Sequence, residues 1–341
     1  DAELTAMNEC MPHYYRITQG HGQGAELLMN AEAAFMQGNF SDAQILLEQT
    51  YSTIASNGQH NISLCCDFLA TRLSLFQEGV TFVKNPEVKR KELLSLHNMM
   101  WLNIFDSTYA YYYALIRMPE KIPALFKDHM LSTVSFLSPC RPMMEMIENQ
   151  VFLSQKMYAK VIGRSETLLP VCEKMHYELV SLHIQIQTAA AYAMLGKHHD
   201  ARQLLQKALG HAMPDGFLIP FVENYNYIKD VLGSINSITP EPFTDRILSL
   251  GSVYEQHCLR LSSHNSRPES LNMLNSREAE IAALITDRLS NREIAERLFL
   301  SEGTVKQYIN QIYSKLMING DTRTKRKQLA ELISSINKGL T

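Results

Sequence analysis

The sequence has 341 residues, of which 45% are hydrophobic and 20% are charged, and its formal net charge is −3. This is the composition of an ordinary globular protein with room for two or more domains. No apolar run approaches the ~18 residues that a membrane-spanning helix needs. Six scattered cysteines lack the spacing of a zinc site or a disulfide framework. We therefore expect free thiols, no bound metal, no membrane span and a cytoplasmic protein.

The two parts of the chain differ in charge. Residues 272–341 contain 11 Lys and Arg against 8 Asp and Glu, whereas residues 1–271 contain 21 against 27. The positive balance of the C-terminal part is small, but its sign suits a negatively charged partner. The chain begins at Asp1 without a methionine or an apolar signal core, so we expect it to be part of a longer protein.

A glycine cluster lies near the start, at residues 20–24. A phosphate-binding loop would need the pattern G-x-x-x-x-G-K-[ST] after a strand, and this cluster has neither the lysine nor the strand. No Ser/His/Asp or Cys/His arrangement stands out elsewhere. The sequence therefore predicts no catalytic residue, no cofactor and no enzyme activity within this chain.

Most of residues 24–260 has the apolar spacing of three and four that is typical of helices. Two stretches share one pattern with identical offsets: Ala31, Ala34, Gly38, Phe40, Ala43 and Leu47, then Ala189, Tyr192, Gly196, His198, Ala201 and Leu205. A weaker copy runs through Lys156, Tyr158, Val161 and Leu168. Small residues let two helices approach closely, and the glycines fall at the turns. The pattern resembles the tetratricopeptide repeat, although the matching positions Tyr158 and His198 are 40 residues apart, a longer period than the usual ~34.

We therefore expect residues 1–261 to form an all-α, tetratricopeptide-like array of helical hairpins. An aromatic-rich stretch lies within it. Trp101, Tyr109 and Tyr112 could line an effector pocket, because a tyrosine has an apolar body and a polar tip. Residues at these positions also have the spacing of a helix face that packs in a core, so both interpretations stay open.

The segment 262–272 is polar, contains Pro268 and lacks apolar periodicity. It predicts a linker between two domains. Three helix starts follow it. Asn275 with Glu278, and Ser290 with Glu293, have the spacing of capping boxes, and Ser301 can cap a third helix.

These caps predict short helices at about 276–287, 291–298 and 302–316. The last two are joined by a tight turn, which is the arrangement of a helix-turn-helix unit. The apolar positions that we expect to face inward on the first two helices are Ile281, Leu284, Ile285, Ile294, Ala295 and Leu298.

The helix 302–316 has two distinct faces. Val305, Ile309, Ile312 and Leu316 form an apolar stripe that must face the other helices. The opposite side presents Gly303, Lys306, Gln307 and Asn310. Lysine, glutamine and asparagine are side chains that read base edges in the major groove. Gly303 lets the backbone lie close to DNA. Taken alone, such a polar face occurs on any amphipathic helix. The tight turn before this helix and the three helix caps, found together, favour DNA binding instead.

The stretch from Leu274 to Leu316 resembles the DNA-binding domain of LuxR-type regulators over more than 40 contiguous positions. Its most specific segments are Arg277-Glu278, Leu289 to Ala295 and Ser301 to Lys306. The resemblance implies a four-helix helix-turn-helix domain over residues 273–341. It also implies that Lys306, Gln307 and Asn310 face bases and that Thr304, Tyr308 and Lys315 approach phosphates.

The sequence departs from this family at three places. Tyr308 replaces a common histidine, Met317 replaces a common glycine, and the loop 318–322 is about one residue longer than usual. The loop puts the start of the fourth helix, and the family's dimer contact there, in doubt. The basic run 323–327 includes Arg323 and Lys325. It either touches the DNA backbone or is a solvated helix start.

The helical array resembles one subgroup, the large MalT-like regulators, which place an ATP-binding module before a tetratricopeptide-like array and a LuxR-type domain. No such module is present here. We expect a sequence-specific transcription regulator that binds double-stranded DNA as a homodimer, while its array receives a small-molecule or protein effector. The alternative is a protein-interaction scaffold with a vestigial DNA-binding domain.

Overall fold

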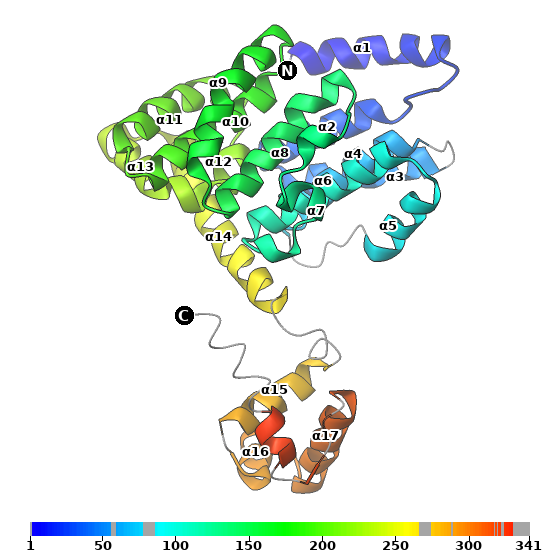
Figure 1. Ribbon diagram of the computed structural model, residues 1–341, viewed down its shortest axis with the longest axis vertical. Coiled ribbons are helices and arrows are strands. Elements are labelled where there is room, and N and C mark those ends of the chain that lie inside the picture. The colour runs from blue at the N-terminus through cyan, green and yellow to red at the C-terminus, as the bar shows by residue number, and fades with distance from the viewer. Residues whose placement is uncertain are drawn as a thin grey trace. The chain divides into compact units, whose positions relative to one another are not determined.

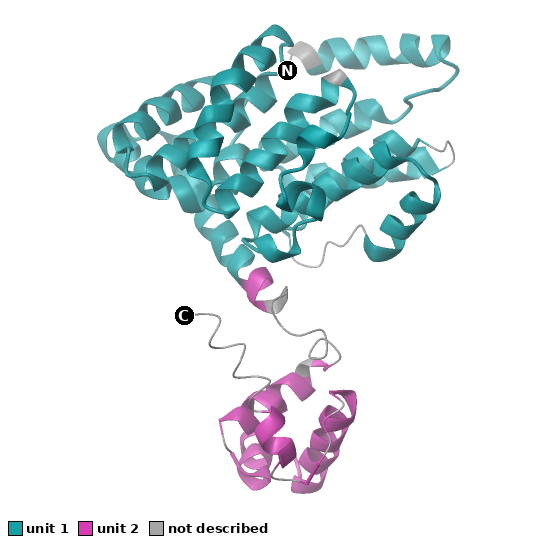
Figure 2. Ribbon diagram, viewed as in Figure 1, with its two compact units in different colours: residues 1–259 teal, residues 260–341 magenta. Residues whose placement is uncertain are grey.

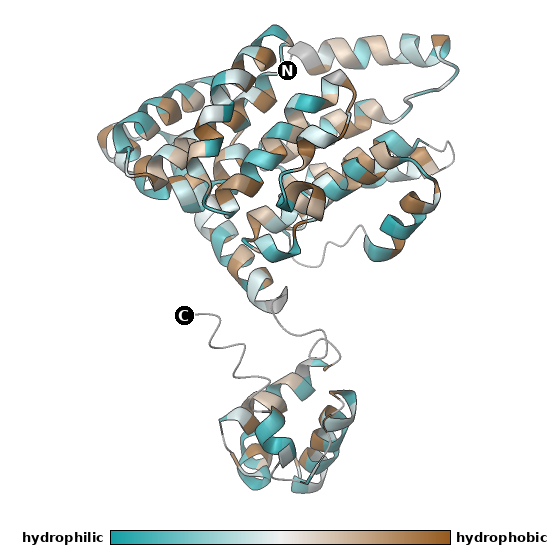
Figure 3. Cartoon of the chain, viewed as in Figure 1, coloured by the Kyte–Doolittle hydropathy of each residue, from teal (hydrophilic) through white to brown (hydrophobic). Residues whose placement is uncertain are grey.

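The computed structural model describes residues 2–55, 59–77, 86–265, 274–287, 289–316, 318, 320–321 and 324–329. Throughout these ranges the regular structure is helical, without a strand, which confirms the all-α prediction. The chain divides into two compact units, residues 1–259 and 260–341 (Figure 2). Hydrophobic and hydrophilic positions are interspersed along the helices of both units (Figure 3), as expected where each helix buries one face.

The α-helices of the first unit are α1 (Ala2–Ile17), α2 (Ala25–Met36), α3 (Phe40–Ala55), α4 (His60–Leu73), α5 (Pro86–Ser95), α6 (Met99–Leu115), α7 (Ala124–Lys127), α8 (Arg141–Ser154), α9 (Tyr158–Lys174), α10 (Glu178–Met194), α11 (His198–Ala212), α12 (Ile219–Glu223) and α13 (Tyr225–Ile238) (Figure 1). The next helix, α14 (Pro242–Asn265), begins in the first unit, and its last residues, 260–265, belong to the second. Short 3-10 helices lie between α6 and α8, at η1 (Pro119–Lys121), η2 (Leu131–Thr133) and η3 (Ser138–Cys140). The second unit contains α15 (Ser276–Thr286), α16 (Asn291–Leu298) and α17 (Glu302–Lys315), and residues 324–329 are also helical. Within the described ranges, every helix is too short or too polar to cross a bilayer.

One type of turn recurs between the helices of the first unit. Five connections of three residues hold their middle residue at positive φ, namely Gly38, His97, Lys156, His176 and Gly196. In four of them the next residue donates its backbone N–H to the carbonyl five positions earlier, which is the hydrogen bond of a Schellman helix end. The predicted turn positions at the two glycines are therefore confirmed, with φ values of 78 and 75 degrees.

The two matching stretches of the sequence form closely packed hairpins. The first pairs α2 with α3, and the second pairs α10 with α11. Six residues of the shared pattern are fully buried, namely Ala31, Ala43, Leu47, Ala189, Ala201 and Leu205, whereas Ala34, Phe40 and Tyr192 are half-buried and His198 is exposed. Small side chains at these positions allow the close approach that was predicted. The hairpins are thus confirmed, whereas the assignment to a tetratricopeptide-like array stays a prediction.

A buried ion pair joins distant parts of the first unit. Arg72 of α4 donates from Nε to Oε1 of Glu223 in α12 at 2.8 Å, and from Nη1 to Oε1 of Glu32 in α2 at 2.8 Å. The Tyr111 hydroxyl donates to the other Glu223 oxygen at 2.8 Å. Because an unpaired buried charge is costly, removing either partner of such a pair typically destabilises a fold by about 3–5 kcal/mol. This cluster therefore fixes α12 against the N-terminal helices.

The predicted linker begins later than the sequence indicated. The helix α14 continues through Asn265, so the first four of residues 262–272 are helical. These positions are polar but contain no glycine or proline before Pro268, and polar residues alone do not end a helix. Residues 266–272 lie outside the described ranges.

Candidate DNA-binding surface

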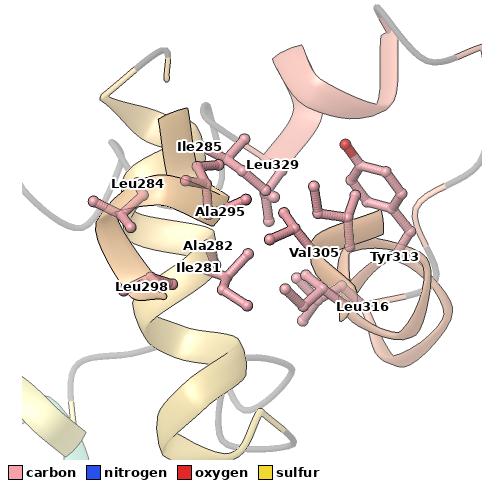
Figure 4. Packing of buried hydrophobic residues seen from close by; sticks show 13 residues of the cluster. Ile281, Ala282, Leu284, Ile285, Ala295, Leu298, Val305, Tyr313, Leu316 and Leu329 are labelled. Atoms are coloured by element: carbon pink, nitrogen blue, oxygen red, sulfur yellow. The ribbon is translucent and has the colours of Figure 1, made fainter. Parts of the chain in front are cut away.

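One hydrophobic cluster holds the helices of the second unit together. It comprises Ile281, Ala282, Leu284, Ile285, Ile294, Ala295, Leu298, Val305, Ile309, Ile312, Tyr313, Leu316 and Leu329. Figure 4 shows side chains of α15 and α16 meeting those of α17 around Val305, with Leu329 of the helical segment 324–329 among them. Every inward position predicted on the three helices belongs to this cluster, so those predictions are confirmed.

Each of the three helices begins at the predicted cap. The Asn275 side chain accepts from the Glu278 N–H at 2.9 Å, and the Glu278 carboxylate accepts from the Asn275 N–H at 2.8 Å. Ser290 and Glu293 form the same reciprocal pair, and the Ser301 hydroxyl accepts from the N–H of the third helical residue. Each cap typically contributes about 1 kcal/mol. These short helices therefore start where the sequence indicates.

Two arginines connect the helices of the second unit through hydrogen bonds. Arg277 of α15 donates from Nη2 to the Leu298 carbonyl at 2.8 Å, at the C-terminal end of α16. A cation at this end also suits the helix dipole. Arg326 donates to the Leu289 carbonyl and to the Asn291 side chain, both at 3.0 Å. These contacts fix the orientation of α16 beside the helix that carries the candidate DNA contacts.

The predicted base-facing residues lie on the exposed side of α17. Gly303, Lys306, Gln307 and Asn310 are all exposed, and the opposite face is buried in the cluster. Among the described residues, the side chains of Lys306, Gln307 and Asn310 form no hydrogen bond or ion pair. Ser314 and Gln311 are exposed on the same side of the helix. Sequence reasoning did not single out these two, although the helical period places Ser314 in line with Gly303 and Asn310.

The predicted phosphate-facing residues of α17 lie along one flank of the helix. Thr304, Tyr308 and Lys315 recur at intervals of four and seven residues, so they project from one side, and each is half-buried. Tyr308 packs against the hydrophobic cluster. The Lys315 Nζ lies 2.6 Å from Oε2 of the buried Glu278. A flank at the border of the exposed face is where a helix in the groove would meet the DNA backbone.

The basic run after α17 is only partly described. Arg323 lies outside the described residues. Lys325 is half-buried, and its Nζ lies 5.7 Å from the centre of the Tyr313 ring. Its neighbour Arg326 donates a hydrogen bond to the Leu289 carbonyl in the loop before α16. The arginine thus has a structural role that sequence reasoning missed, since no local pattern marks a contact with a carbonyl 37 residues away.

Phe299, in the turn of the helix-turn-helix unit, was not singled out from the sequence. It is 96% exposed and has a φ of 55 degrees. A left-handed conformation is unusual for a bulky residue. The only signal in the sequence is an aromatic residue in a turn that ordinarily favours glycine or asparagine.

The aromatic residues predicted as an effector pocket lie in the first unit. Trp101 donates from Nε1 to Asn61 at 2.7 Å and packs, together with Tyr109, against a small hydrophobic cluster that includes Phe105. Tyr112 instead makes a ring contact with its neighbour Tyr113. The structure thus brings two of the three residues together, and their contacts are those of a packed helix face.

Comparison with known proteins identifies the second unit. Residues 272–326 match the family of bacterial regulatory proteins described as the luxR family. The chain is 42% identical to the transcriptional regulatory protein LnrK of Bacillus subtilis over 110 residues, which is 32% of this chain and 49% of LnrK. It is 43% identical to the transcriptional regulatory protein DegU of Brevibacillus brevis over 53 residues, 16% of this chain and 22% of DegU.

A third relative, the DNA-binding transcriptional activator DevR/DosR of Mycobacterium tuberculosis, is 33% identical over 57 residues, 17% of this chain and 26% of that protein. The chain thus spans half or less of the length of each of these relatives. No solved structure matches the chain significantly.

Proposed function

Because residues 272–326 form a LuxR-type helix-turn-helix DNA-binding domain, we propose that this chain is a sequence-specific transcription regulator that places α17 in the major groove. The observation that carries the proposal is the division of α17 into two faces. One face is buried, and the other exposes polar side chains that have no described partner within the protein.

Three of these side chains have the chemistry to read bases. Lys306 can donate to the acceptors on the major-groove edge of guanine, while Gln307 and Asn310 can pair with adenine. Gly303, one turn before Lys306, carries no side chain and allows the backbone to lie close to the groove. An added Cβ at Gly303 would lie 3.7 Å from the Ser301 hydroxyl, so glycine is not required by packing within the chain.

The backbone contacts would come from the flank of α17 and from the basic run beyond it. Thr304, Tyr308 and Lys315 are proposed to approach the phosphates of one strand, and Arg323 and Lys325 to approach the backbone near the end of the domain. Such contacts fix the register of a protein on DNA and supply affinity without sequence preference. A domain with a net charge of only +3 holds few phosphates, so we propose that the chain acts as a homodimer on two half-sites.

The first unit is proposed to be a tetratricopeptide-like array that receives the control signal. Its support is the packed hairpins α2–α3 and α10–α11 and the resemblance to MalT-like regulators. A superhelical array offers a broad surface for a protein or small-molecule effector. Trp101, Tyr109 and Tyr112 remain the candidate effector contacts in the proposal. A regulator of this kind would act in the bacterial cytoplasm, where the DNA is.

The direct test is selection of bound sequences from random duplex DNA by the purified full chain. We expect enrichment of one motif, repeated as two half-sites. The variant Lys306→Ala/Asn310→Ala should enrich a more degenerate motif under the same conditions. Recovery of random sequences by the unmodified chain would favour the alternative, a protein-interaction scaffold with a vestigial DNA-binding domain.

A further inference from the structure

One carboxylate joins the beginning of α15 to the end of α17. Glu278 is 1% exposed, and its Oε2 accepts from the Asn275 backbone N–H at 2.8 Å and from the Lys315 Nζ at 2.6 Å. The same glutamate therefore completes a helix cap and fixes the last residue of the candidate recognition helix. In the second capping box, Ser290 with Glu293, the glutamate is exposed, and no lysine among the described residues is bonded to it.

The contacts of Glu278 also favour its charged form. Burial raises the pKa of Glu278, but the hydrogen bonds from Lys315 and Asn275 and the charge of Lys315 lower it by more, so this pKa lies below its usual value. The Lys315 ammonium is held at one position, although its side chain is still 38% exposed. An ammonium has three N–H donors, so donors remain for a second partner on the exposed side.

We propose that Glu278 is a positioning residue for DNA binding, which holds the Lys315 ammonium on the flank of Thr304 and Tyr308 where it meets a backbone phosphate. This inference rests on the proposed function. A free lysine must give up side-chain freedom when it binds a phosphate. A lysine already held by a buried carboxylate has lost that freedom on folding, and such preorganisation strengthens binding.

Glu278→Gln tests the proposal because two effects of this change would shift the DNA affinity in opposite directions. Glutamine can also complete a capping box, so the cap is kept while the charge that holds Lys315 is removed. Simple electrostatics predicts tighter DNA binding, since the domain becomes more positive. Loss of positioning predicts weaker binding. The matched control is Glu293→Gln, which makes the same change at the same position of the other capping box.

The measurement is the affinity of the full chain for a duplex DNA across a range of salt concentrations. We expect Glu278→Gln to weaken binding roughly threefold to tenfold at low salt, and to make the salt slope shallower by about 0.9, the value for one lost phosphate contact. Glu293→Gln should leave binding unchanged or tighten it slightly. In a Lys315→Gln background, Glu278→Gln should no longer weaken binding, because no ammonium remains to be positioned.

Equal or tighter binding by Glu278→Gln in the unmodified background would overturn the inference. If Glu278→Gln loses helical content, the salt dependence of DNA binding is measured on Lys315→Gln instead. An unchanged salt slope in Lys315→Gln would show that Lys315 neutralises no phosphate. Failure of the proposed function has a different signature. In that case the unmodified chain would bind duplex DNA without salt dependence or not at all, before any variant is compared.

Discussion

A side chain can read a base edge only if it is exposed and not already bonded within the protein. Lys306, Gln307 and Asn310 meet both conditions among the described residues. Lys315 does not, because it is bound to Glu278, and this suits a contact with the uniform backbone better than one with a base. Residues of one helix thus divide by their surroundings into two sets, which suit the two roles proposed for them.

We predict that Lys306→Ala and Asn310→Ala each relax the preference for one DNA sequence. A good base contact contributes about 1–3 kcal/mol of discrimination against the wrong base. The measurement is the affinity of the full chain for a selected duplex and for duplexes with single base changes. The control is Lys207→Ala, which removes an exposed lysine of α11 and should change neither affinity nor preference. Discrimination unaltered in both test variants would mean that other residues read the bases.

His183 gives the first unit a predictable response to acid. Burial and the charge of Arg72 lower the pKa of His183 to about 3, below the ~6.5 of an unfolded chain. The unfolded state therefore binds a proton that the folded state excludes, and the free energy of unfolding falls as the pH drops from about 6.5 toward 3.

We predict that His183→Gln removes this contribution, so that the variant loses less stability than the unmodified chain between pH 7.5 and pH 5. The single tryptophan, Trp101, lies in the first unit, and its fluorescence during urea unfolding reports that unit alone. The same loss of stability in both proteins would show that His183 is not buried in its neutral form.

Among the elements, the three capped helices of the second unit were the easiest to predict, whereas the Asn98 cap of α6 was not predicted. The caps at Asn275, Ser290 and Ser301 gave α16 its observed bounds and α17 to within one residue. Turns were harder. The glycines Gly38 and Gly196 indicate two of the turns in the sequence, but His97, Lys156 and His176 adopt the same left-handed conformation. A residue without a special preference gives no local signal, and there the packing of the flanking helices determines the turn.

We predict that the same change, glycine to alanine, has opposite effects on stability at two glycines. Added Cβ atoms at Gly196 and Gly163 would meet nothing within 4 Å, so only the backbone matters. Gly196→Ala should destabilise by about 1 kcal/mol, because its φ of 75 degrees suits glycine. Gly163→Ala, inside α9, should stabilise by about 0.5–1 kcal/mol. Urea unfolding followed by Trp101 fluorescence measures both, and two changes of the same sign would contradict the turn assignment.

Contacts between elements were beyond sequence reasoning. The Glu278 capping role was predicted from a spacing of three, but its pairing with Lys315 spans 37 positions. The same holds for Arg72 and Glu223, which are 151 positions apart. Nothing in the local sequence distinguishes a charge that will be buried and paired from one that will stay in solvent, because only the assembled core decides which residues meet.

For the whole molecule, the change in composition near residue 262 indicated two parts, and the structure has two compact units that divide at residue 259. The second unit was the more predictable, because a short domain with three caps leaves few alternatives. The first unit was less predictable. Aromatic residues at core spacing, such as Trp101 and Tyr109, look the same in sequence whether they pack or line a site.

If the first unit joins protomers, it should control how the chain binds DNA. We predict that the full chain binds a duplex with two half-sites cooperatively. Residues 272–341 alone should bind without cooperativity, with dissociation constants near the ~10⁻⁴ to 10⁻⁶ M of non-specific binding. Titration of both proteins against one labelled duplex, across protein concentration, makes the comparison. Identical affinity and cooperativity would mean that the first unit has no role in DNA binding.

We propose that this chain recognises a DNA sequence through α17, and the ratio of its specific to its non-specific affinity is the measurement that checks this claim. The full chain is titrated at physiological salt against a labelled duplex that carries the selected motif, in competition with unlabelled duplexes of shuffled sequence. Specific regulators prefer their sites by at least about a thousandfold, and we predict a ratio of that order, which should fall in Lys306→Ala/Asn310→Ala. Equal affinity for the motif and the shuffled duplexes would contradict the claim.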